Sequence, residues 1–176
     1  MADQQAQPGD NSRQLVLQKL YVKDLSFESP KAPDVFRINA EAQTQLNIRT
    51  GNRQVDDQHT EVSLTITVES KANEETMFLV ELVQAGVFLI QGYSDQEKAM
   101  LLGSFCPGTL YPFAREAIAD IAQKGGFPQL LLQPINFDAL YAQAQQERAQ
   151  QEAAGGTDLT PPDLSSAPPQ GDGGTH

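Results

Sequence analysis

The chain has 176 residues, of which 23 are acidic and 12 basic, and its formal net charge is -11. This charge argues against binding nucleic acid or an anionic membrane by electrostatic attraction. Unbroken apolar runs reach only a few residues, as at 87–90, so we expect no direct insertion into a membrane. The start of the chain has no secretory signal pattern and Cys106 is the single cysteine, so we expect a protein of the reducing cytoplasm.

The two ends lack the pattern of a folded segment. Residues 1–13 are polar, and residues 154–176 combine prolines, glycines and aspartates without any lysine or arginine. Segments of this composition cannot bury enough apolar surface to offset the entropy of the chain. We therefore expect a disordered lead-in at 1–13, one folded domain at 14–153 and a disordered acidic tail at 154–176.

The first half of the sequence predicts four β-strands. Apolar and polar residues alternate in EVSLTITVES, which is the period of a half-buried antiparallel strand. After the first strand, Pro30 and Pro33 prevent a regular ladder, so we expect a crossing loop there. Short links between the strands predict an antiparallel meander. The expected strands are 14–29, 44–50, 61–70 and 76–90.

The second half changes to a helical period. Ser94 is followed three residues later by Glu97, which is a capping-box pattern. Apolar residues then recur at helical spacing from 110 to 121. Asn136 can cap a second helix from 137 to about 153, which is apolar only at its beginning. Strands followed by helices predict an α+β fold, a four-stranded antiparallel sheet followed by two main α-helices.

Groups suited to catalysis are sparse. His59 and His176 have no cysteine or carboxylate at the spacing of a metal site, and no glycine-rich phosphate loop occurs. Cys106 precedes Pro107 near a helix start, but a catalytic cysteine also needs a histidine base. A buried small residue explains Cys106 more simply. We expect no enzymatic activity, no cofactor and no metal.

The sequence instead indicates a function in binding, through exposed side chains of the strands and loops. Asp24 and Glu28 share one side of the first strand, and Leu79 and Glu81 share one side of the fourth. If these sides match in one sheet, they form a flat acidic patch around an aliphatic residue. The patch is either an ordinary exposed face or a docking face for a basic partner. The apolar residues of the strands and of the leucine-rich loop also exceed what the domain can bury, which indicates self-association or a binding groove.

Four blocks of the sequence together resemble the SecB family of bacterial protein-export chaperones. They are YVKDLSFESPKAPDVF, EETMFLVELVQAGVF, FCPGTLYPFAREAI and GGFPQLLLQPINFDALY, and the resemblance runs from about Leu15 to Tyr141. It implies a homotetramer, a dimer of dimers, without catalytic activity. It also implies an ATP-independent holdase that keeps unfolded secretory preproteins in apolar grooves in the cytoplasm and delivers them to the SecA ATPase.

The resemblance implies roles for particular residues. SecA binding falls on Asp24, Glu28, Leu79 and Glu81, the residues that alternation also groups. The residues that it assigns to the client-binding groove are Leu46, Ile48, Phe113, Phe137, Leu140 and Tyr141. The residues that it assigns to the packing of protomers are Val80, Leu82 and Gln84.

This chain departs from the family pattern at two points. Ala40 stands where a tryptophan of the crossover loop is expected, so Phe36 is the candidate for that aromatic wall. The tail is acidic where relatives often have basic residues that touch SecA. Three other functions stay open: a SecB-type chaperone that guards an antitoxin, a thiol-dependent enzyme that uses Cys106, and a module that binds a small ligand between sheet and helices.

Overall fold

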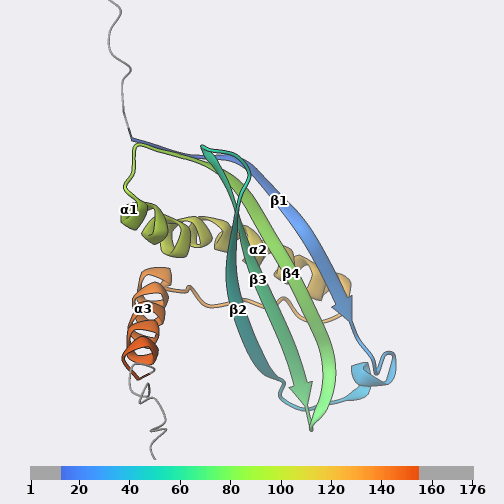
Figure 1. Cartoon of the computed structure of the whole chain (residues 1–176). Coiled ribbons are helices and arrows are strands. Elements are labelled where there is room, and N and C mark those ends of the chain that lie inside the picture. Colours follow the sequence, from blue (N-terminus) through green and yellow to red (C-terminus); the bar gives the residue numbers. More distant parts are fainter. Residues whose placement is uncertain (1–12, 155–176) are drawn as a thin grey trace, which may run out of the picture. The chain divides into compact units, whose positions relative to one another are not determined.

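The computed structural model describes residues 13–154, and of 152–154 only the backbone. The segments that we expected to be disordered lie almost entirely outside the described residues. The described part divides after Gln143 into two units, and the second begins within the last helix. The elements, shown in Figure 1, are β1 (Gln14–Glu28), η1 (Asp34–Arg37), β2 (Gln43–Gln54), β3 (His59–Ala72), β4 (Glu75–Gln91), α1 (Asp95–Met100), η2 (Leu101–Phe105), α2 (Cys106–Lys124) and α3 (Phe137–Ala154).

The four strands form one antiparallel sheet in the order β1-β4-β3-β2 (Figure 1). The strands β2, β3 and β4 follow one another as the expected meander, but the prediction that β1 pairs with β2 is wrong. The segment after β1, with Pro30, Pro33 and the 3₁₀ turn η1, instead carries the chain to the opposite edge of the sheet. This order places β1 beside β4, where the two acidic stretches can meet.

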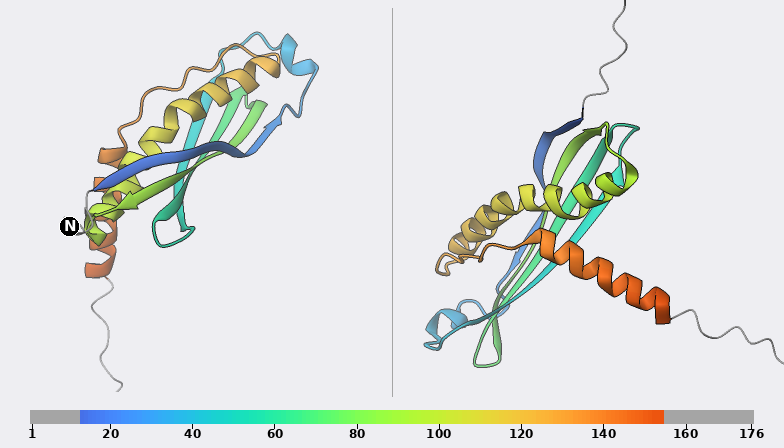
Figure 2. Two further views of the ribbon diagram at one scale, coloured as in Figure 1. Left: turned by 90° about the horizontal axis from the view of Figure 1, so that it is seen from above. Right: turned by 90° about the vertical axis from the view of Figure 1, so that its left-hand side faces the viewer.

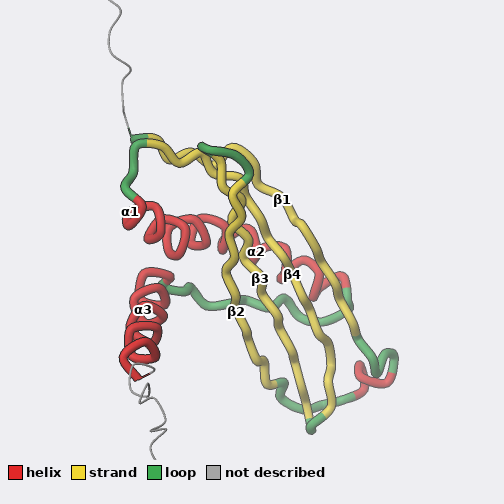
Figure 3. The backbone as a smooth tube through the Cα atoms, viewed as in Figure 1, coloured by secondary structure: helices red, strands yellow, loops and turns green. Residues whose placement is uncertain are grey.

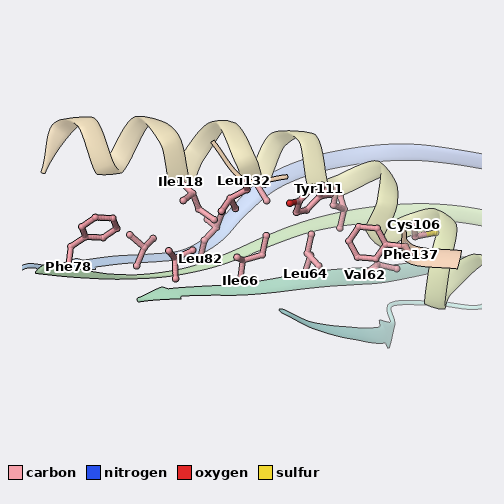
Figure 4. Close-up of a cluster of buried hydrophobic side chains, with 14 of the residues drawn as sticks. Val62, Leu64, Ile66, Phe78, Leu82, Cys106, Tyr111, Ile118, Leu132 and Phe137 are labelled. Carbon is pink, nitrogen blue, oxygen red and sulfur yellow. The ribbon is translucent and has the colours of Figure 1, made fainter. Parts of the chain in front are cut away.

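One face of the sheet is buried beneath α2, as Figure 2 shows. Every second side chain of the alternating β3 stretch, from Val62 to Val68, is fully buried on this inner face. Ile118 of α2 meets them in the core (Figure 4). Leu110 and Ala114 of α2 belong to the buried side chains as well. No described helix of the first unit lies over the other face, which we call the open face.

Gly86 of β4 permits this close packing, as its sequence position in a strand indicated. A Cβ atom there would lie 2.9 Å from Leu110 Cδ2 of α2 and 2.8 Å from Leu17 Cδ1 of β1. Both distances are shorter than ordinary contacts, so a larger residue would push the helix from the sheet. The β1 ladder has irregularities between Leu17 and Lys19 and between Val22 and Asp24.

The helical segment begins with the expected capping box at Ser94 and Glu97. It continues from α1 through the π-helical turn η2 into α2. A π turn widens the helix just before Pro107, whose ring cannot accept the normal spacing and whose nitrogen has no proton to donate.

The segment between α2 and α3 returns along α2 (Figure 3). Phe127 and Leu132 of this segment are buried in the core. The Tyr111 hydroxyl of α2 donates to the Gln133 carbonyl oxygen at 2.5 Å. These contacts position the start of α3, where the buried Phe137 ring meets the edge of the Tyr111 ring at 5.6 Å.

Glu61 ties the strands together on the open face. Its carboxylate accepts from the Tyr21 hydroxyl at 2.5 Å, from Lys23 Nζ at 2.9 Å and from Arg53 Nε at 3.0 Å. Tyr21 and Lys23 belong to β1, so their side chains reach across β4 above Ala85, which is fully buried. These donors, Tyr21 first, hold the pKa of the Glu61 carboxyl at about 2 against the opposing effect of burial.

We expect Glu61→Gln to lower the free energy of unfolding by roughly 3 kcal/mol near neutral pH. The folded-state pKa of about 2 lies below the ordinary value of 4.5, so the charged carboxylate stabilises the fold above about pH 4.5. That stabilisation is lost as pH falls toward 2, and the difference between the variant and the parent should shrink in parallel. Urea unfolding at one fixed protein concentration, near pH 7 and near pH 3, measures both values.

Glu69→Gln is the matched control for this experiment. Glu69 lies on the same strand and face but is half-exposed, with hydrogen bonds from Lys71 and Thr76 only. Glu69→Gln should lower the free energy of unfolding by less than Glu61→Gln does at every pH. Equal losses of unfolding free energy for the two variants at both pH values would contradict the role of Glu61 as a buried carboxylate that joins the strands.

Candidate functional site

The predicted acidic patch is assembled on the open face. Glu28 of β1 pairs with Leu79 of β4, and Ser26 pairs with Glu81. Paired residues of an antiparallel ladder point to the same side, so Asp24, Glu28, Leu79 and Glu81 lie side by side on neighbouring strands. The carboxylates are exposed and Leu79 is half-buried between them. Their role in binding a partner stays a prediction.

Glu69 extends this patch onto β3, and we did not name it from the sequence. It pairs with Leu79, and an ion pair of 3.0 Å with Lys71 holds the pKa of its carboxyl below the ordinary value. The signal was present, because Glu69 shares a side with Thr65 and Thr67 in the alternating stretch. What was missing was the pairing register between β3 and β4.

The residues assigned to the packing of protomers, Val80, Leu82 and Gln84, are buried within the single chain. Their exposed fractions there are 0%, 0% and 3%. They point to the inner face, and Gln84 Nε2 donates to the Tyr21 carbonyl oxygen at 2.9 Å. Their role in the packing of protomers stays a prediction.

The predicted groove residues lie at three separate places. Leu46 and Ile48 lie on the inner side of β2, the edge strand farthest from β1, and Leu46 is 41% exposed. Phe113 instead lies at the opposite edge, where it lines a hollow of about 330 Å³ between α2 and β1 together with Leu20 and Val22. The sheet order therefore separates Phe113 from Leu46 and Ile48.

The third group lies at the start of α3. Phe137 is only 6% exposed and belongs to the core, and its assignment to the client-binding groove stays a prediction. Leu140 is exposed, and the Tyr141 ring lies so close to Gly103 that an added Cβ would clash with it. Asn136 Oδ1 accepts from the Ala139 amide at 3.0 Å, which is the expected cap.

Further apolar side chains are exposed near this group and near η1. Leu131 of the returning segment is 67% exposed, and Phe105 is also exposed. Phe36 packs its exposed ring on the buried Phe127 ring, with 5.3 Å between the ring centroids, and its role as an aromatic wall of the groove stays a prediction. Phe127 was missed from the sequence, because nothing in its local pattern indicates that rings from four segments meet there.

Catalytic and metal-binding alternatives gain no support from the geometry. Cys106 is fully buried, and burial raises the pKa of its thiol to about 12, so it is a poor nucleophile. His59 does have a carboxylate neighbour, contrary to expectation, since its Nδ1 lies 2.8 Å from Asp56 Oδ1. That pair closes a turn, and the described residues hold no cluster of three or more groups suited to a metal.

A hollow of about 650 Å³ lies between the start of α2 and the start of α3. Ser104 donates a hydrogen bond to Asp138 beside it, and Phe105, Thr109 and Ile135 line it. The hollow is open to solvent and half polar, unlike the enclosed apolar cavities typical of small-molecule sites. Among the described helices, none has both the length and the apolar character needed to cross a membrane.

Comparison with known proteins identifies the relatives of this chain. A family model described as preprotein translocase subunit SecB matches residues 7–148. Protein-export protein SecB of Methylococcus capsulatus is 49% identical over 87% of this chain and 96% of its own length. The protein of the same name from Nitrosococcus oceani is 47% identical over 86% of this chain and 94% of its own length.

A solved structure shares the fold at low sequence identity. It is the Mycobacterium tuberculosis SecB-like chaperone Rv1957 in complex with a ChAD peptide from the antitoxin HigA1. It matches with a TM-score of 0.59 and 14% identity, over 69% of this chain and 90% of its own. The family model and the near-complete match to export chaperones decide the assignment: this chain belongs to the SecB family of protein-export chaperones.

Proposed function

We propose that this protein is an ATP-independent holdase of the cytoplasm, which binds unfolded secretory preproteins and passes them to the SecA ATPase. The observation that carries the proposal is that apolar and acidic exposed side chains lie on two different surfaces. Exposed apolar side chains gather on the helix side of the sheet, whereas acidic side chains gather at one end of the open face. Membership of the SecB family supports the same conclusion.

Holding a client needs only the hydrophobic effect. An unfolded chain exposes apolar segments, and burying each one contributes about 1 kcal/mol or more. Leu46, Phe36, Leu131 and Leu140 offer separate apolar contacts, and several weak contacts along one client add through effective concentration. Because only the unfolded client binds, its folding equilibrium shifts by mass action without ATP hydrolysis.

Docking to SecA relies on charge. Asp24, Glu28 and Glu81 surround Leu79 on a face that α2 does not cover. Charged groups of this kind steer encounter with a basic partner and are weakened by salt. The client surface and the docking face lie on opposite sides of the sheet, so one protein can hold a client while it is bound to SecA.

We also propose that the protein is a homotetramer, a dimer of dimers, and that β1 contributes to self-association. As an edge strand, β1 has unpaired backbone groups along its outer side. Val16, Val22 and Leu25 are exposed on it, and Phe113 is exposed beside it in the hollow under α2. These residues join Val80, Leu82 and Gln84 as candidates for the packing of protomers.

The holdase proposal predicts a complex with an unfolded client. A secretory precursor is diluted from denaturant into the protein, and light scattering on a sizing column gives the mass of the complex. We expect one client per four protomers, and no complex with the same precursor after it has folded. A protein that elutes as a single protomer and ignores the unfolded precursor would contradict the proposal and favour the small-ligand alternative.

Charge reversal separates the two surfaces. We expect Asp24→Lys with Glu81→Lys to weaken SecA binding about tenfold at low salt, and to leave capture of the unfolded precursor nearly unchanged. Glu116→Lys is the control, because Glu116 is an exposed carboxylate on α2, which covers the inner face. Calorimetry with SecA and the mass measurement with precursor give both affinities, and equal loss of both would refute the separation.

A further inference from the structure

The open face carries opposite charges at its two ends. One row across all four strands consists of Lys19, Val87, Glu61 and Arg53, in the order β1-β4-β3-β2. A parallel row at the other end consists of Glu28, Leu79, Glu69 and Gln45. These rows are eight residues apart on β4, which is roughly 26 Å at the usual rise of a strand.

The basic end consists of Lys19, Lys23 and Arg53, with Glu61 as its carboxylate. Arg49 lies midway along the face, in the same row across the sheet as Asp24. Lys23 and Arg53 both bind Glu61, which therefore neutralises one positive charge of the two. Lys19 and Arg49 form no ion pair within the described part of the chain, and both are exposed. The basic end thus has a surplus of positive charge that no neighbouring side chain absorbs.

The acidic end has the opposite surplus. Asp24, Glu28 and Glu81 form no ion pair among the described residues, and Glu69 is paired with Lys71. In a chain with a net charge of -11 and only 12 basic residues, three basic residues at one end of one face, with Arg49 between the ends, are a local concentration. A uniformly acidic coat, which would serve solubility, does not have this arrangement.

We propose that the basic end is the second half of the docking face. The partner that meets the acidic end through basic groups presents an acidic segment to Lys19, roughly 26 Å along the strands from the row of Glu28, and to Arg49 between the two ends. This inference rests on the proposed docking of SecA to the open face. Because the two ends have opposite signs, the partner can dock in one orientation along the sheet and not in the reverse orientation.

A second copy of the chain is the competing occupant, since a face with opposite ends also complements itself after a half-turn. The middle of the face argues against it. Ser63, Thr65 and Thr67 run along β3 there, beside Val83 and Val87 of β4, which are only half-exposed, and stable interfaces between copies usually expose more apolar surface. The exposed apolar residues lie instead on the β1 edge and on the helix side. A polar face with charged ends suits a transient partner.

Substitutions that reverse the charge of Lys19 and Arg49 test the proposal, because it predicts weaker and not tighter binding to SecA. Against SecA, Lys19→Glu with Arg49→Glu should weaken binding about three- to tenfold at low salt, with a smaller effect at high salt. Lys19→Gln should cause an intermediate loss, and Lys124→Glu, the same reversal on α2, should change little. A partner with only basic groups would bind the Lys19→Glu, Arg49→Glu variant more tightly, because the face becomes more acidic.

The outcomes separate this inference from the function on which it rests. Weaker binding for basic-end and acidic-end variants, with Lys124→Glu unchanged, supports both. Unchanged or tighter binding after basic-end reversal overturns the inference, while loss at the acidic end leaves the proposed docking intact. No loss from either end overturns both. A changed mass by light scattering for the basic-end variant, without loss of SecA binding, identifies a second copy as the occupant and overturns the inference.

Discussion

Coverage of the sheet on one face only is the constraint from which the other features follow. α2 lies over the inner face, where Val62, Leu64 and Ile66 are fully buried, and Gly86 lets the helix come close. The open face has to remain stable in water without a helix over it. Glu61 meets this need, because its carboxylate joins side chains of β1 and β2 across β4 and covers Ala85. The result is a flat, charged surface on a rigid support.

The two sides of the sheet suit two kinds of interaction. On the helix side, exposed side chains such as Leu131 and Phe36 gain from contact with any apolar segment, so recognition there needs little sequence specificity. On the open face, exposed charges gain from a partner of matching pattern, and their effect depends on salt. A chaperone of the SecB family needs both properties at once, since it must accept many clients and a specific partner. Because the sheet lies between the two surfaces, a client on the helix side and a partner on the open face do not compete for the same side chains.

Periodicity predicted the strands and the sides of individual residues, because alternation is a local property. Asp24 and Glu28 on one strand, and Leu79 and Glu81 on another, could thus be grouped before the sheet was known. The order of the strands depends on the long crossing loop, which local patterns do not describe, and β1 was placed wrongly for that reason. The burial of Val80 and Leu82 within the single chain could not be predicted, because it depends on the packing of α2. The contacts of Glu61 needed the register, which sequence spacing alone does not provide.

Chemical protection of single thiols tests the separation of the two surfaces most directly. Cys106 is fully buried and its thiol has a pKa raised to about 12, so thiols introduced at Thr67 on the open face and at Leu131 on the helix side can be followed separately. Alkylation rates of the Thr67→Cys and Leu131→Cys variants are measured with SecA or with unfolded precursor. We expect SecA to slow only Thr67→Cys and the precursor to slow only Leu131→Cys. Equal protection of both positions by either partner would contradict the account.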